Sequence, residues 1–181
     1  TVFDVVLGLL RDPAQWHPIT LSRAIFHALS ILKSSYDHDF VKVHSLLHTI
    51  ANLPQQVIAK SSDTTLGGLA ACTEEPGSLR SEIMKSPDFW AILRILAGNP
   101  DCATSVFAIL ENGATGNPPA IVADNYEAAI GLLNFFASAA APIEPSELNS
   151  VPNQRRVQKP LKPDNESVER GCRAIITLQH M

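Results

Sequence analysis

The chain has 181 residues, of which 45% are hydrophobic and 18% charged, and its net charge is -4 at neutral pH. This length is enough for one domain with its own core or for several helical repeats. The acidic balance argues against a nucleic-acid-binding protein, which needs a basic face to meet phosphates. The low share of charged residues indicates that much of the surface contacts other protein.

Helical periodicity begins with apolar residues that recur at helical spacing over residues 21–32. Thr20 is expected to cap this helix through its hydroxyl. A second apolar stripe covers residues 40–50, with Asp37 as the expected cap. Because the junction at Ser34 is short, these two helices are predicted to form an antiparallel hairpin. Shorter helices are predicted over residues 55–60, 65–72 and 78–85.

A second hairpin starts at Ser86, Pro87 and Asp88, which supply a capping hydroxyl, a proline at the first helical position and an acid near the positive helix end. The buried face is expected to contain Phe89, Ile92, Leu93 and Leu96. Gly98 is expected to end this helix in the left-handed conformation.

The same start signal repeats over residues 99–101, and Asn112 and Gly113 are predicted to end the helix that follows. A long helix is then expected after Asp124. The apolar residues predicted on one of its faces are Tyr126, Ile130, Leu133, Phe136 and Ala137. Convincing strand alternation appears nowhere in the sequence.

These patterns predict an all-α fold, an armadillo/HEAT-like stack of helical hairpins over residues 1–141, with a compact helical bundle as the alternative. Residues 142–164 are rich in proline and poor in apolar residues, which predicts a flexible linker. Residues 165–181 are predicted to form a further helix of the same solenoid. The chain starts at Thr1 and stops at Met181 inside apolar patterns, which suggests a segment of a larger protein.

Few residues suggest chemistry. His44 and His48 have the spacing of a zinc pair, but no glutamate of a metalloprotease motif lies between them. No phosphate-binding loop or nucleophile elbow is present. Cys72, Cys102 and Cys172 are far apart, which favours reduced thiols in a cytosolic compartment. The sequence therefore predicts no catalytic residue, no cofactor and no metal site.

Two features could contact a lipid or a partner. The first is a basic cluster in the proline-rich linker, formed by Arg155, Arg156, Lys159 and Lys162. The second is Trp90, which follows Phe89 directly, so that one helix face cannot hide both equally. Trp90 or Phe135 is a candidate for a groove between helices, although packing against the next repeat is the favoured use. Most of the large aromatic residues, Trp16 among them, are expected in the core.

The helical patterns also resemble a known family. Residues 86–94, 106–110, 118–130 and 133–138 are similar to the downstream helical region of fungal large Arf guanine-nucleotide exchange factors of the Golgi brefeldin-A-resistance (Gea/GBF) class. The stretches Phe3-Asp-Val-Val-Leu and Ile25-Phe-His-Ala-Leu extend the resemblance, which continues more weakly at Val168-Glu-Arg-Gly.

The resemblance implies a non-catalytic, homology-downstream helical segment, because exchange in that family is performed by a separate Sec-seven-type domain. The implied location is cytoplasmic and peripheral on Golgi membranes, in vesicle-mediated transport. The implied partners are other domains of the parent exchange factor, small GTPases of the Arf/Rab type, the Golgi membrane surface and a second copy of the parent protein. The alternatives are a generic armadillo-like adaptor that binds peptides or helices outside trafficking, and an enzyme with a cryptic site.

Overall fold

The computed structural model describes residues 1–35, 39–114, 119–121 and 123–140 of the chain. In these ranges the protein is all-α and contains no strand. The elements in chain order are α1 (Val2–Arg11), η1 (Pro13–Gln15), α2 (Pro18–Ser34), α3 (Phe40–Ala51), α4 (Gln55–Lys60), α5 (Ser62–Thr73), α6 (Ser78–Lys85), α7 (Pro87–Ala97), η2 (Pro100–Cys102), α8 (Ala103–Ala114) and α9 (Ala123–Ala140). The predicted linker over 142–164 and the predicted helix over 165–181 lie outside the described residues.

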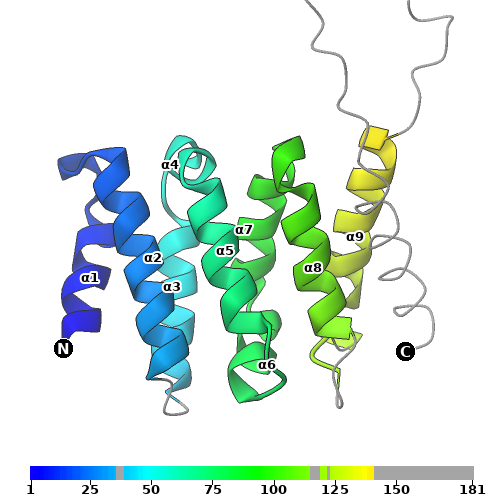
Figure 1. Cartoon of the computed structure of the whole chain (residues 1–181), viewed down its shortest axis with the longest axis horizontal. Coiled ribbons are helices and arrows are strands. Elements are labelled where there is room, and N and C mark those ends of the chain that lie inside the picture. Colours follow the sequence, from blue (N-terminus) through cyan, green and yellow to red (C-terminus); the bar gives the residue numbers. More distant parts are fainter. Residues whose placement is uncertain (36–38, 115–118, 122, 141–181) are drawn as a thin grey trace, which may run out of the picture.

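The helices pack side by side in two rows along the long axis of the molecule (Figure 1). In one row α2 contacts α5, and α5 contacts α8. In the other row α1 contacts α3, α3 contacts α7, and α7 contacts α9. The short helices α4 and α6 lie at opposite edges of the stack (Figure 1). None of the helices in the described part of the chain combines the length and the apolar character needed to cross a membrane.

The first helix, α1, follows from a local signal that the periodicity analysis did not assign to a helix. Thr1 and Asp4 form a capping box, in which the Thr1 side chain accepts from the Asp4 amide and the Asp4 side chain binds back to the N-cap backbone. The Thr1 contacts also lower the pKa of Asp4. Phe3, Leu7 and Leu10 then recur at helical spacing and turn one face of α1 into the core.

The structure corrects the predicted caps of the first hairpin. Thr20 lies inside α2, which begins at Pro18 because proline suits the first helical position; the N-cap is His17, whose Nδ1 accepts from the Ile19 amide. The cap of α3 is Asp39, which accepts from the Lys42 amide at 3.3 Å. The expected cap Asp37 lies outside the described residues. The helices α2 and α3 are in contact, as the hairpin prediction requires.

The helix α7 begins and ends differently from its prediction in two details. Pro87 starts the helix, as expected, but the Ser86 hydroxyl makes no capping hydrogen bond and is buried without a partner. Gly98 has φ -66° and ψ -13°, which is right-handed rather than left-handed. The reason is that the chain continues in a helical sense through Asn99 into η2, so no reversal is needed at Gly98.

The other boundaries differ by a few residues. The prediction for 55–60 and 78–85 is confirmed by α4 and α6, while α5 extends the predicted 65–72 at both ends. The residues that follow Asn99 form the 3-10 turn η2 before α8 starts. Asn112 and Gly113 do not end α8, which continues to Ala114, and α9 starts at Ala123, before Asp124.

Close contact between α2 and α5 depends on Gly68. A Cβ atom built at this position would lie 2.5 Å from Cδ1 of Leu29, whose side chain is fully buried on α2. Real Cβ atoms do not approach that closely, so glycine allows the two helix backbones to come together. This contact sets the spacing between α2 and α5.

Candidate functional site

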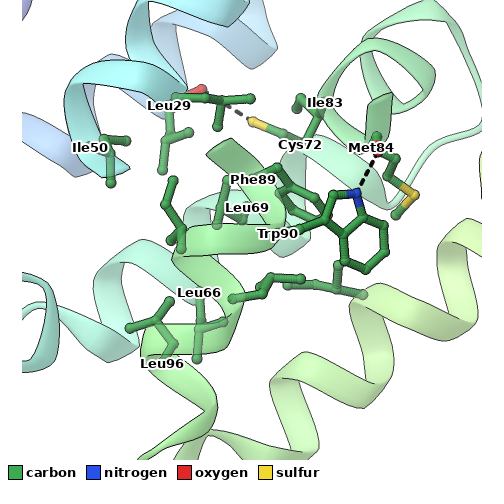
Figure 2. Packing of buried hydrophobic residues seen from close by; sticks show 14 of the residues in the cluster. Leu29, Ile50, Leu66, Leu69, Cys72, Ile83, Met84, Phe89, Trp90 and Leu96 are labelled. Atoms are coloured by element: carbon green, nitrogen blue, oxygen red, sulfur yellow. Dashed lines mark hydrogen bonds between the residues drawn. The ribbon is translucent and has the colours of Figure 1, made fainter. Parts of the chain in front are cut away.

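Trp90, one of the two sequence-predicted contact features, is buried. Its exposed fraction is 5%, and that of its neighbour Phe89 is 0%. The two rings pack edge to face with centroids 5.1 Å apart (Figure 2). The burial of Trp90 agrees with packing against a neighbouring helix, the use that the sequence favours, and its contact with a lipid or a partner stays a prediction.

The reason that both adjacent rings are hidden is the central place of α7. This helix contacts α3, α4, α6, α8 and α9, so it is covered over more than one face. Sequence reasoning assumed a single buried stripe on each helix, with Trp90 at its edge. A helix enclosed by several neighbours hides residues that lie roughly 100° apart around its axis.

The indole of Trp90 helps to connect α7 with its neighbours. Its Nε1 donates to the backbone carbonyl of Met84 at 2.7 Å (Figure 2). The side-chain Nδ2 of Asn125 donates to the same carbonyl, also at 2.7 Å. One oxygen near the end of α6 therefore accepts hydrogen bonds from α7 and α9. Such buried, satisfied polar groups hold the three helices in one register.

The second sequence-predicted feature is the basic cluster of the linker. Arg155, Arg156, Lys159 and Lys162 lie outside the described residues, so their geometry plays no part in the site. The side chain of Phe135, the other aromatic residue considered for a groove between helices, also lies outside the description.

The paired histidines of α3 lie on its exposed face, and each is close to a carboxylate of α6 or α7. His48 Nδ1 lies 3.2 Å from Asp88 Oδ2, and His44 Nε2 lies 3.9 Å from Glu82 Oε2. Glu82 also accepts from Lys85 at 3.0 Å. The side chains of His44 and His48 are 49% and 71% exposed, so water screens both contacts.

Over the part of the chain that the structure describes, no group of three or more metal-ligating side chains comes together. Cys72 and Cys102 are buried free thiols. Burial raises the pKa of Cys72 to about 11, and burial also raises that of Cys102. The Cys72 Sγ donates to the carbonyl of Leu29 at 3.5 Å, which makes this thiol a packing group.

Arg80 on α6 is a buried cation that the sequence analysis did not single out. Its exposed fraction is 4%, and its Nη1 donates to the Asn112 carbonyl in the last turn of α8 at 2.7 Å. Cations are favourable at the negative end of a helix dipole. The Nε atom has no hydrogen-bond partner. Arg80 therefore ties α6 to the end of α8.

Two surface depressions lie near the N-terminal end of the stack. The larger, which we call the α2–α4 depression, has a volume of about 420 Å³ and is lined by His17, Pro18, Ile19, Ser22, Arg23 and Lys60. The other, of about 280 Å³, lies between α1 and α3 and is lined by Leu10, Arg11, Pro13, Ser45, His48, Thr49, Asn52 and Leu53. Both have polar and apolar walls, which suits noncovalent binding of a ligand or partner.

Sequence reasoning missed the α2–α4 depression because its cations are distant in the chain. Arg23 lies on α2 and Lys60 ends α4, and only the fold brings them to one surface. Trp16, assigned to the core from its type alone, is 41% exposed directly before His17. The one sequence signal that was available is a stripe on α2, in which Ile19, Arg23 and Phe26 share a face at helical spacing.

Comparison with known proteins adds no relative: no family model, no curated protein and no solved structure matches this chain.

Proposed function

We propose that this chain is a non-catalytic, regulatory scaffold segment of a large Golgi Arf guanine-nucleotide exchange factor. In this proposal it contributes to membrane recruitment, to partner binding and to the control of Arf activation in vesicle-mediated transport. The observation that carries the proposal is the coincidence of two features. The stretches that resemble this family fall mainly on α1, α2, α7, α8 and α9, and these helices belong to one two-row stack.

The two-row arrangement supports an armadillo/HEAT-like stack as the finer description of the fold. In such solenoids each unit packs mainly on its neighbours, and the row surfaces become extended binding faces. Here each row is built by contacts between consecutive members, and the short helices α4 and α6 connect the rows at the edges. A long surface of this kind is suited to holding partners in place rather than to enclosing a substrate.

The partners that we propose follow from the same family resemblance. They are other domains of the parent exchange factor, small GTPases of the Arf/Rab type and the surface of Golgi membranes, with pairing of two parent copies as a further contact. The chain would then be cytoplasmic and peripheral on those membranes. The α2–α4 depression and the depression between α1 and α3 offer places for such contacts.

The test combines an exchange assay with a recruitment assay. The purified chain, mixed with Arf loaded with a fluorescent nucleotide, is expected to leave nucleotide release at its spontaneous rate. The tagged chain, expressed in cells, is expected to concentrate at the Golgi and to co-purify with an Arf-type or Rab-type GTPase. A chain that spreads evenly through the cell and binds a peptide ligand instead would replace this proposal with the generic adaptor, and accelerated release would show catalysis.

A further inference from the structure

The α2–α4 depression combines positive charge with an open cavity. Arg23 comes from the middle of α2 and Lys60 from the last turn of α4, and both line the same space. Among the described residues, neither side chain makes an ion pair or hydrogen bond, so their charges face solvent and any ligand that enters. The acid closest in sequence to Lys60 is Asp63, on the first turn of α5, and it does not line the depression.

One lining residue of the depression is held by a hydrogen bond between helices. The Ser22 hydroxyl donates to Thr64 Oγ1 at 3.1 Å, which joins α2 to α5. His17 uses Nδ1 to accept from the Ile19 amide, so a neutral His17 carries its proton on Nε2 as a donor. The depression also lies at the start of α2, where the helix dipole is positive. All of these features favour an anion.

Large exposed apolar residues line the depression, share its face of α2, or directly precede it in the chain. Ile19 lines it and is 58% exposed, while Trp16 and Phe26 are 41% and 48% exposed. Ile19 and Phe26 are seven residues apart on α2, which places them on the same helix face as Arg23. Large apolar residues next to cations are the pattern of a surface that enters the boundary between lipid headgroups and acyl chains.

We propose that the α2–α4 depression binds the headgroup phosphate of an anionic phospholipid, while Trp16, Ile19 and Phe26 insert into the membrane boundary beside it. This inference rests on the proposed function for its setting, since it names the surface and the lipid class for membrane recruitment. It also moves the lipid contact from the linker cations, Arg155 to Lys162, to the folded stack.

Two observations favour a membrane over an acidic peptide. The volume of about 420 Å³ suits a single headgroup, whereas a helical peptide needs a longer groove. Of the three large exposed apolar residues, only Ile19 lines the depression, whereas Trp16 and Phe26 do not. A peptide groove places its apolar anchors inside the groove. Two weak signals, charge and apolar insertion, then act together, as stable anchoring requires.

The experiment is a vesicle co-sedimentation assay on the full chain. It uses phosphatidylcholine vesicles and vesicles of phosphatidylcholine and phosphatidylserine at about three to one. The chain is expected to bind the anionic vesicles and not the neutral ones. Replacing Arg23→Gln together with Lys60→Gln is expected to weaken binding about 30-fold, because each cation near an anionic surface contributes about 1 kcal/mol.

A control pair of the same charge change is Lys85→Gln with Arg94→Gln, on α6 and α7, which should leave binding unchanged. All four cations are exposed, so neither pair should disturb folding, and circular dichroism checks this. The double change Ile19→Ser and Phe26→Ser is expected to weaken binding without altering the preference for anionic vesicles.

A variant in which Arg155, Arg156, Lys159 and Lys162 are all changed to Gln separates the linker from the stack. It should keep most of the binding; loss of binding in this variant, with full binding in the Arg23 and Lys60 variant, would overturn the proposal. Equal binding to neutral and anionic vesicles would overturn it as well. So would binding of soluble glycerophosphoserine or of an acidic peptide as tightly as vesicles, because the membrane would then contribute nothing.

The assay contains no GTPase and no other part of an exchange factor. Failure of vesicle binding therefore leaves the regulatory proposal to be judged by its own exchange and recruitment experiments. Conversely, the chain could bind anionic vesicles through Arg23 and Lys60 and yet bind no Arf-type or Rab-type GTPase. That result would support the lipid site and contradict the proposed role in an exchange factor.

Discussion

The helices α1 and α7 are similarly apolar in sequence, but the structure buries more residues of α7 than of α1. In α7 the buried residues are Phe89, Trp90, Ile92, Leu93, Leu96 and Ala97. In α1 only Phe3, Leu7 and Leu10 are buried, while Val2 and Val5 are 72% and 68% exposed. The difference lies in the neighbours: α7 contacts α3, α4, α6, α8 and α9, whereas α1 contacts α2 and α3.

The comparison teaches that in a stack of helices, burial depends on position as much as on residue type. An interior helix can bury residues all round, and an end helix buries one stripe. Stability should therefore be concentrated in α7 and its surroundings, and binding surface near α1 and α2. The predictions that follow change matched residues in the interior and at the end or open face of the stack.

The largest effect is expected at Phe89. Its change to Ala should lower the free energy of unfolding by about 3–5 kcal/mol, from lost transfer energy and the cavity that remains. Val5→Ala on α1 should change it by less than about 0.5 kcal/mol, because Val5 is exposed. Urea unfolding followed by circular dichroism measures both; similar midpoints for the two variants would contradict the contrast between interior and end.

The pH dependence of the free energy of unfolding tests whether the Cys72 thiol is buried in the interior. Its pKa is raised by burial from 9.0 to about 11, so the folded state favours the neutral thiol. The contribution of this neutral thiol to the free energy of unfolding is fully present below about pH 9 and is lost as the pH rises through about 11. The decrease is about 2–3 kcal/mol for two pKa units. Urea midpoints between pH 8 and about 11 should fall more for the parent than for Cys72→Ala.

The same thiol should resist labelling in the native state at pH 8. In a Cys102→Ala, Cys172→Ala background, a thiol reagent should react with Cys72 only after urea is added. Rapid labelling of the folded protein would mean that the α2–α5 contact around Leu29 opens readily.

Two adjacent glycines of α5 compare the interior and the open face within one helix. Gly68→Ala should cost about 1–3 kcal/mol, because its Cβ would overlap the buried Leu29. Gly67→Ala meets no atom within 4 Å and should instead stabilise the helix by about 0.5–1 kcal/mol. Thermal melts report both; a stabilising Gly68→Ala would show that α2 and α5 are packed less tightly than described.

The smallest difference in stability is expected between substitutions of the two tryptophans, Trp90 and Trp16. Trp90→Phe should cost about 1–2 kcal/mol, because it removes the hydrogen bond to Met84 and leaves a gap beside Phe89. Trp16→Phe, at an exposed site, should change stability by less than about 0.5 kcal/mol. Equal costs for these changes, measured by urea unfolding, would contradict the buried place of Trp90.

Much of the fold could be predicted from periodicity and start signals. Pro87 and the stripe that contains Phe89 and Leu96 placed α7 correctly, since these signals are local and strong. Caps were less predictable: several residues near a helix start can accept an amide hydrogen bond, and Pro18 decided in favour of His17 over Thr20. The 3-10 turn after Asn99 was also missed, because its sequence is a helix start signal as well.

The candidate site was harder to predict than the fold. Trp90 was expected near the edge of the buried stripe and is only 5% exposed, while Trp16 was grouped with the core aromatics and is 41% exposed. Both differences arise because sequence does not reveal how many helices surround a given residue. The stripe on α2 that contains Arg23 can be read from the sequence, but Lys60 is brought beside it only by tertiary packing.

The shared acceptor at Met84 has a consequence for cooperativity. Because the buried donors of Trp90 and Asn125 converge on one carbonyl, moving α9 away from the stack removes a partner from Asn125, and moving α7 removes one from Trp90. A buried donor that loses its acceptor without gaining water costs free energy, so a movement of α6 that withdraws the Met84 carbonyl affects α7 and α9 together. Local opening of α6 would then disturb the interior at once, while fraying of α1 at the far end would leave that interior closed.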